Sequence, residues 1–175
     1  MAVNISNHQL CRGNLIDTVT EVLFETGMEP CELELEVTES IVMNNPKAAI
    51  EVLNELRALG VHIAVDDFGT GYSSLMYLKK LPLSSLKIDR GFVADIGRDK
   101  NDETIVIATI NLAHSLGLTV TAEGIETAEQ AEFLRAHDCD DLQGYYFSWP
   151  LPVEEITDWL HLEFTSSSQM EIMVS

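Results

Sequence analysis

Polar side chains recur at the ends of short strand-like segments, and these residues could do chemistry. In chain order they are Asn4, Glu36, Asp66, Asp67, Lys87, Asp89, Glu123 and Gln143. Carboxylates brought within about 4 Å of one another repel strongly, so a cluster of this kind requires cations. Because the candidate ligands all bind through oxygen, Mg²⁺ or Mn²⁺ suits them better than zinc.

The adjacent pair Asp66-Asp67 is the most informative part of this set. Successive strand residues face opposite ways, so both acids can serve one site only where the strand turns into its loop. The following residues Phe68-Gly69-Thr70-Gly71 predict such a turn. A carboxylate pair of this kind can bridge two metal ions, an arrangement used for in-line displacement at phosphorus.

Each candidate also has a simpler interpretation. Glu36 could be solvated, Asp66-Asp67 could mark a turn, and Lys87 could be a surface charge. Gln143 could bond at a sheet edge, and Glu123 could enter a loop. Their joint position at successive strand ends favours a shared site, because the simpler interpretations predict no such register.

The elements that would position these residues alternate between strands and helices, which is typical of βα units. Six strands are predicted, at residues 3–6, 32–37, 61–67, 85–89, 118–123 and 142–146. Helices are predicted between them, and a short one from about Val153 to Leu160 follows the last strand. Thr127 and Gln130 fit a capping box at the start of one helix.

The strands themselves favour a barrel over an open doubly wound sheet. In the segment from Glu32 to Val37, carboxylates alternate with aliphatic residues, whereas a strand covered by helices on both faces would be apolar throughout. The predicted fold is therefore a TIM-like (β/α) barrel with a polar interior. A complete barrel needs eight strands, so this one is incomplete, with about six of eight βα units, and two units are expected to be absent before Val3. We expect the domain to cover residues 1–162 and a tail to cover residues 163–175.

Composition excludes several classes of function. The formal charge of −19, from 29 acids against 10 bases, argues against binding nucleic acid. No apolar run is long enough for a membrane span, and no signal peptide is visible, so a cytoplasmic location is expected. Cys11, Cys31 and Cys139 are far apart and show neither disulfide nor zinc spacing.

Five segments of this sequence carry a family resemblance. They are Glu36-Val37-Thr38-Glu39-Ser40, the run from Asp66 to Leu75, Leu86-Lys87-Ile88-Asp89-Arg90, Ala122-Glu123-Gly124-Ile125-Glu126-Thr127 and Gln143-Gly144-Tyr145. In this order they resemble the signature blocks of EAL domains, from Val3 to about Pro152. The resemblance implies a phosphodiesterase that hydrolyses cyclic di-GMP to pGpG with Mg²⁺ or Mn²⁺.

The resemblance also implies a role for each residue. Asn4, Glu36 and Asp66 correspond to ligands of one metal ion, and Asp66, Asp67 and Glu123 surround a second. Lys87 resembles the lysine that contacts the attacking water, and Gln143 resembles a residue that supports this water or the phosphate. Glu39 resembles the glutamate that anchors the loop after Asp67, while Asp89 and Glu126 stand behind the ligands or form the substrate wall.

The Glu-Ala-Leu motif that names the family is missing, and with it a ligand glutamate and an arginine that grips a substrate phosphate. Three interpretations remain open: an impaired phosphodiesterase, a non-catalytic remnant that binds cyclic di-GMP or a protein, and a piece of a longer enzyme. The two strands beside the gap would be unpaired edges, so a homodimer that covers them is a further expectation.

Overall fold

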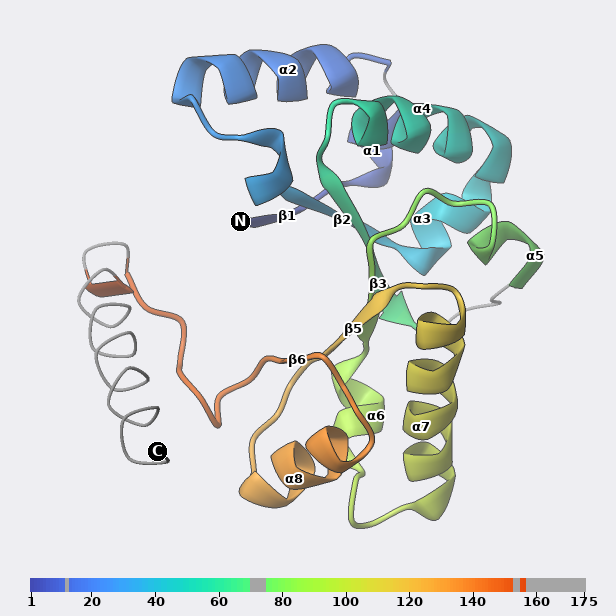
Figure 1. Ribbon diagram of the computed structural model, residues 1–175, viewed down its shortest axis with the longest axis vertical. Helices are drawn as coiled ribbons and strands as arrows, with labels where there is room; N and C mark the ends of the chain where they lie inside the picture. Colours follow the sequence, from blue (N-terminus) through green and yellow to red (C-terminus); the bar gives the residue numbers. More distant parts are fainter. Residues whose placement is uncertain (12, 70–74, 153–154, 157–175) are drawn as a thin grey trace, which may run out of the picture.

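The fold is built on one parallel sheet whose strand order follows the chain (Figure 1). A computed structural model describes residues 1–11, 13–69, 75–152 and 155–156. The strands are β1 Ala2–Asn4, β2 Glu34–Thr38, β3 His62–Phe68, β4 Ser85–Ile88, β5 Thr119–Ala122 and β6 Asp141–Leu142. Every neighbouring pair is parallel. This is the incomplete TIM-like barrel that the sequence predicts.

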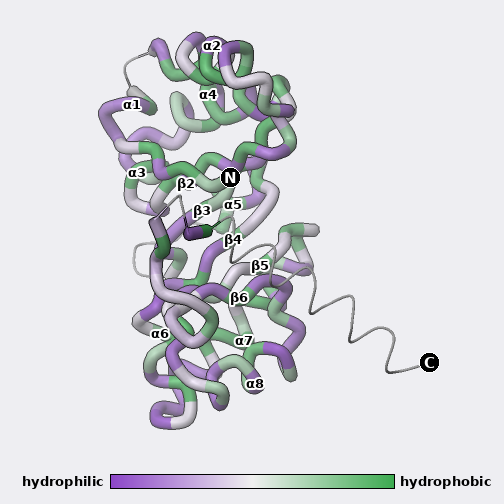
Figure 2. Tube along the Cα trace, turned by 90° about the vertical axis from the view of Figure 1, so that its left-hand side faces the viewer, coloured by the Kyte–Doolittle hydropathy of each residue, from purple (hydrophilic) through white to green (hydrophobic). Residues whose placement is uncertain are grey.

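Helical segments connect the strands. They are α1 Asn7–Cys11, α2 Leu15–Thr26, the 3₁₀ turn η1 Pro30–Glu32, α3 Glu39–Asn44, α4 Pro46–Ala58, α5 Leu75–Leu78, α6 Arg90–Ala94, α7 Lys100–Ser115 and α8 Ala128–Ala136. The capping box of Thr127 and Gln130 is present at the start of α8, as predicted. Along the helices, hydrophobic and hydrophilic residues alternate in short stretches, as expected for elements with one buried face (Figure 2).

The core lies between the aliphatic face of the sheet and the helices. Leu35, Val37, Ile63 and Leu86 are at most 2% exposed and belong to one cluster with the helical residue Leu53. The other residues of β2 and β4 alternate with them, and these include Glu36, Ser85 and Lys87, which are also buried. The predicted alternation is confirmed, and these three polar residues are closed to solvent.

Three local predictions differ from the structure. The segment around Glu32 is a 3₁₀ turn closed by a reciprocal cap between Glu29 and Glu32, so β2 begins only at Glu34. β6 ends at Leu142 instead of Tyr146, because the chain after it turns onto the backbone of Ile125. The short helices α1, α3, α5 and α6 were not predicted. The predicted helix at 153–160 and the tail at 163–175 lie outside the described residues, apart from helical residues 155–156.

Among the described residues, β1 and β6 each pair on one side only. Beside β1, an apolar groove of about 250 Å³ runs between the strand and α2, and Val3, Leu15, Val22 and Leu35 are among its lining residues. The predicted open edges are therefore present. No helix in the described residues has both the length and the apolar character to cross a membrane.

Candidate active site at the carboxyl ends of the strands

Lys87 lies at the centre of the acid cluster. Its Nζ atom contacts Glu36 Oε1 at 2.6 Å and Asp66 Oδ1 at 3.9 Å, and it also forms a salt bridge with Glu123. Glu36 and Lys87 are only 6% and 5% exposed. Four side chains that are distant in sequence therefore form one network, and its three carboxylates outnumber the single ammonium group.

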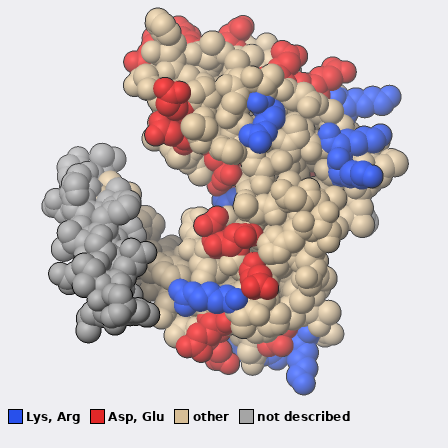
Figure 3. Space-filling model, in the orientation of Figure 1, with Lys and Arg blue, Asp and Glu red and all other residues tan. Residues whose placement is uncertain are grey.

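The parallel register explains why these residues meet. Glu36, Asp66 and Lys87 project from β2, β3 and β4, and Glu123 directly follows β5. The carboxyl ends of parallel strands lie at the same edge of a sheet, and barrel enzymes place their chemistry there. Acidic side chains gather on the hollowed side of the molecule in this view (Figure 3). Asn4, the last residue of β1, is in register with Glu36 and exposed.

A bulge places Asp66 and Asp67 together. Both residues lie within β3, so the predicted turn into a loop is not what brings them to one site. Instead, the register between β3 and β4 shifts between Val65 and Phe68. Asp67 adopts a left-handed backbone conformation with φ 54°, which aspartate tolerates better than most residues. Its amide donates a 2.9 Å hydrogen bond to Asp66 Oδ1.

Two further acids hold the backbone around this bulge. Glu39 Oε2 accepts a 3.1 Å hydrogen bond from the amide of Gly69, the residue after β3. Asp89 caps α6 by accepting from the amide of Gly91 at 2.9 Å, and its side chain lies close enough to Asp67 to raise the pKa of that carboxyl. Glu39 and Asp89 thus contact residues beside the acid cluster.

The electrostatics reflect an excess of negative charge. Burial raises the pKa of Glu123, and the nearby Lys87 offsets only part of that rise. The pKa of Asp67 is also raised, by burial and by the charges of Asp66 and Asp89. Burial alone would lower the pKa of Lys87, but its bonds to Glu123 and Glu36 outweigh burial and raise it. The lysine is held in its charged form.

The donor set fits a hard divalent cation by its chemistry, because several carboxylates share only one ammonium group. Their present arrangement differs from that of a metal site. Among the described residues, no three His, Cys, Asp or Glu side chains are placed so that they could hold a metal ion. The carboxylate oxygens of Glu36 and Glu123 converge on Lys87 Nζ instead.

Gln143 and Glu126 lie beside the cluster. Both line a cavity of about 430 Å³, together with Glu123, Arg90 and Tyr145. The segment that carries Gln143 is fixed by the backbone of Ile125, whose amide donates to Gln143 O and whose carbonyl accepts from the amide of Tyr146. The cavity adjoins the acid cluster at Glu123.

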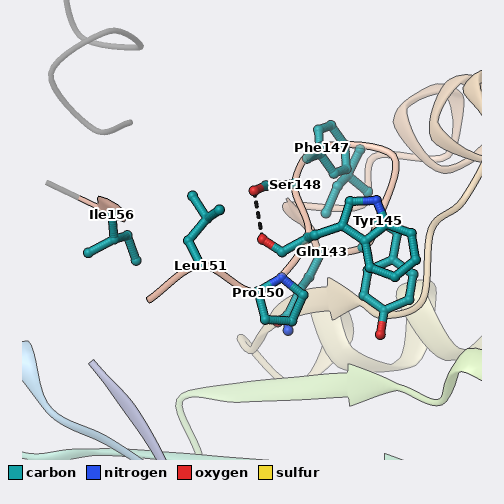
Figure 4. Close-up of a pocket in the computed structure, with 10 residues that line it drawn as sticks. Gln143, Tyr145, Phe147, Ser148, Pro150, Leu151 and Ile156 are labelled. Atoms are coloured by element: carbon teal, nitrogen blue, oxygen red, sulfur yellow. Dashed lines mark hydrogen bonds between the residues drawn. The ribbon is translucent and has the colours of Figure 1, made fainter. Parts of the chain in front are cut away.

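Sequence reasoning missed a second cavity on this side. It measures about 410 Å³, and its lining includes Gln143, Tyr145, Phe147 and Leu151 (Figure 4). The rings of Tyr145 and Trp149 stack with their centroids 4.0 Å apart. The run of aromatic residues from Tyr145 to Trp149 was the available signal. Arg90, which lines the neighbouring cavity, was also given no role.

Fold and site together define an incomplete α/β barrel with an oxygen-rich centre at the carboxyl ends of its strands. The chain belongs to the EAL domain family, and the sequence model of that family matches residues 1–150.

Two curated relatives come from Pseudomonas aeruginosa. The bifunctional diguanylate cyclase/cyclic di-GMP phosphodiesterase MucR is 47% identical over 156 residues, which are 89% of this chain and 23% of MucR. The cyclic di-GMP phosphodiesterase NbdA is 48% identical over 160 residues, which are 91% of this chain and 20% of NbdA. The chain thus spans about a fifth of the length of these relatives.

Solved structures agree with this assignment. The MucR phosphodiesterase in complex with cyclic di-GMP superposes with a TM-score of 0.86 at 47% identity, covering 89% of this chain and 63% of that one. Klebsiella pneumoniae BlrP1, solved with manganese and cyclic di-GMP, gives 0.79 at 32% identity, covering 85% and 38%. BlrP1 was also solved with calcium and the same dinucleotide.

Proposed function

We propose that this chain carries the catalytic face of a cyclic di-GMP phosphodiesterase domain, which hydrolyses the cyclic dinucleotide to linear pGpG. The observation that carries the proposal is the meeting of Glu36, Asp66, Lys87 and Glu123 at one edge of the sheet. Relatives named as cyclic di-GMP phosphodiesterases support the substrate class.

Mg²⁺ or Mn²⁺ is the proposed cofactor. Asn4, Glu36 and Asp66 would hold one ion, and Asp66, Asp67 and Glu123 would hold a second. Bound divalent cations supply charge neutralisation for a phosphodiester and lower the pKa of a bound water.

The remaining groups of the chain would then act on water and substrate. Lys87 orients the attacking water through its ammonium group, and Gln143 supports that water or a phosphate oxygen from the adjoining cavity. Glu39 keeps the backbone at Gly69 in place, and so fixes the bulge that carries Asp66 and Asp67. Asp89 backs Asp67, and Glu126 forms part of the substrate wall.

A second candidate function is binding of cyclic di-GMP without hydrolysis. Two observations favour it for this 175-residue chain: the sheet is open at β1, and Lys87 occupies the point where the acid oxygens converge. The resemblance also assigns a ligand glutamate and a phosphate-gripping arginine to a Glu-Ala-Leu segment that this sequence lacks. We therefore expect slow turnover by this chain alone, and faster turnover after fusion of a Glu-Ala-Leu segment before Met1.

The test combines metal binding with product analysis. Millimolar Mg²⁺ or Mn²⁺ should raise the melting temperature, and Asp66→Asn should abolish the rise. Incubation with cyclic di-GMP and Mn²⁺, followed by chromatography, should yield pGpG slowly in the native chain and not in Lys87→Ala. Asp17→Asn, at an exposed position of α2, is the matched control. Calorimetric binding of cyclic di-GMP with no pGpG, even in the fused chain, would favour the non-catalytic function.

A further inference from the structure

Lys87 is the only cation that the structure places among Glu36, Asp66 and Glu123 within its described residues. Its Nζ atom bonds Glu36 Oε1 at 2.6 Å and also bonds Glu123, while Asp66 Oδ1 lies 3.9 Å away. The side chains of Lys87 and Glu36 are each 7% exposed, and that of Glu123 is 23% exposed. The contacts are thus largely shielded from solvent.

A buried ammonium group requires partners, and buried carboxylates require a cation. The lysine and the acids satisfy each other, and this pairing determines where the oxygens point. The two shortest contacts use Oε1 of Glu36 and Oε1 of Glu123, and both carboxylates belong to the set proposed to hold a metal ion. The same pairing explains why no three acids of the described chain are placed so that they could hold a metal ion.

We infer that Lys87 is the internal counter-ion of this acid centre in the metal-free protein, and that it competes with the divalent cation for Glu36 and Glu123. The inference rests on the proposed metal-dependent function. Binding of the cation displaces the ammonium group, because the two share carboxylate ligands and repel each other as like charges. The displaced group is then free to contact water or a phosphate, so metal loading and the release of Lys87 are one event.

The first experiment measures Mn²⁺ binding without nucleotide. Its readout is the loss of the free-ion signal in electron paramagnetic resonance. Lys87→Met keeps most of the length of the side chain and removes its charge. This variant should bind Mn²⁺ about ten-fold more tightly than the native chain, although its metal-free form should melt at a lower temperature. Lys79→Met removes an exposed lysine and should match the native chain in both measurements.

The second measurement uses the native chain and does not depend on the folding of a variant. Mass spectrometry measures the acetylation rate of individual lysines with and without saturating Mg²⁺. Lys87 should react slowly without the metal and several-fold faster with it, while Lys79 should react at one rate throughout.

Mn²⁺ binding that is equal or weaker in Lys87→Met, or a Lys87 acetylation rate that Mg²⁺ leaves unchanged, would overturn the competition and leave the proposed hydrolysis intact. If the native chain and the variant both fail to bind Mn²⁺, the competition and the metal-dependent function fail together.

Discussion

The Oε2 atom of Glu39, the first residue of α3, accepts a hydrogen bond of 3.1 Å from the amide of Gly69 directly after β3. Glu39 is 3% exposed, and its Oε1 atom has no hydrogen-bond partner among the described residues. A buried carboxylate that makes one hydrogen bond and leaves its other oxygen without a partner adds little net stability. We therefore predict that this contact serves mainly to position the backbone beside Asp66 and Asp67.

Glu39→Ala tests that positioning. The melting temperature without metal should change little, because loss of the hydrogen bond is offset by relief of a buried charge. The affinity for Mn²⁺ should fall by about ten-fold, since the bulge that carries the paired aspartates loses its support. Calorimetric titration measures the affinity, and Glu51→Ala on the exposed side of α4 is the control. Unchanged Mn²⁺ affinity in Glu39→Ala would contradict the positioning role.

Gly144 makes a close approach that no larger residue can keep. A Cβ atom there would lie 2.1 Å from the carbonyl oxygen and 2.3 Å from the nitrogen of Ile125. Gly144→Ala should cost about 3 kcal/mol of unfolding free energy and displace Gln143 from its cavity. Gly117→Ala is the matched control. Its φ of 75° adds backbone strain of about 1 kcal/mol, but Gly117 has open space where the Cβ atom would be added, with nothing within 4 Å. Urea unfolding compares the two, and equal losses would mean that the contact with Ile125 yields easily.

The side chain of Asp140 accepts a backbone hydrogen bond from β5. Its Oδ2 atom accepts a 2.8 Å hydrogen bond from the amide of Val120 in β5 and lies 2.9 Å from His114 Nε2. Burial would raise the pKa of Asp140, but its bonds to His114 and Val120 outweigh burial and lower the pKa below 3.8. Asp140→Ala should lose about 1–3 kcal/mol at pH 7, because the buried Val120 amide is left without its acceptor.

The pH dependence of this loss follows from the sign of the shift. A carboxyl group with a lowered pKa in the folded state contributes stability above its unfolded pKa of 3.8, and this is lost as pH falls through the folded value. The difference between the native chain and Asp140→Ala should thus be full at pH 5–7 and shrink below pH 4. Glu132→Ala, an exposed acid on α8, serves as control in urea unfolding at each pH. A difference that stays constant down to pH 3 would show that the charge of Asp140 contributes nothing.

The groove beside β1 predicts self-association that depends on salt. The net charge of −19 opposes contact between copies, whereas the open edge and the apolar groove favour it. Raising the ionic strength from about 0.01 M to about 0.1 M shortens the screening length from roughly 30 to 10 Å, so dimer content should rise. Light scattering measures the mass across this series.

A pair of variants on α2 locates the contact. Val22 lines the groove and is 47% exposed, whereas Phe24 is 88% exposed and lies outside the lining. Val22→Glu should keep the chain monomeric in high salt, while Phe24→Glu should leave the dimer content unchanged. A cooperatively melting monomer at every salt concentration would rule out pairing through this groove.

Much of this fold could be predicted because its signals are local. The alternation of Glu34 and Glu36 with Leu35 and Val37 marks a strand with one polar face, and Thr127 with Gln130 marks a helix start. The bulge at Asp67 could not be predicted, because a left-handed aspartate in a strand is selected by its neighbours, Asp66 and Asp89 among them, and not by its own preference.

The meeting of Glu36, Asp66, Lys87 and Glu123 at one edge could be predicted from the sequence, and the contacts among them could not. Strand order alone brings Glu36, Asp66 and Glu123 to one edge. The pairing of Lys87 with two of them depends on the register of three strands and on side-chain burial, neither of which a single sequence displays. The roles assigned to Gln143, Glu126 and the metal ligands remain predictions that the experiments above test.

Because each strand lies beside the one synthesised just before it, the sheet can grow in the direction in which the ribosome releases the chain. Among the strands of the described residues, none has to wait for a partner that is translated much later. The acids of the centre are then added one strand at a time, Glu36 first and Asp66 second. Lys87 arrives on the next strand, so the charge that the first two strands accumulate is met as soon as β4 docks.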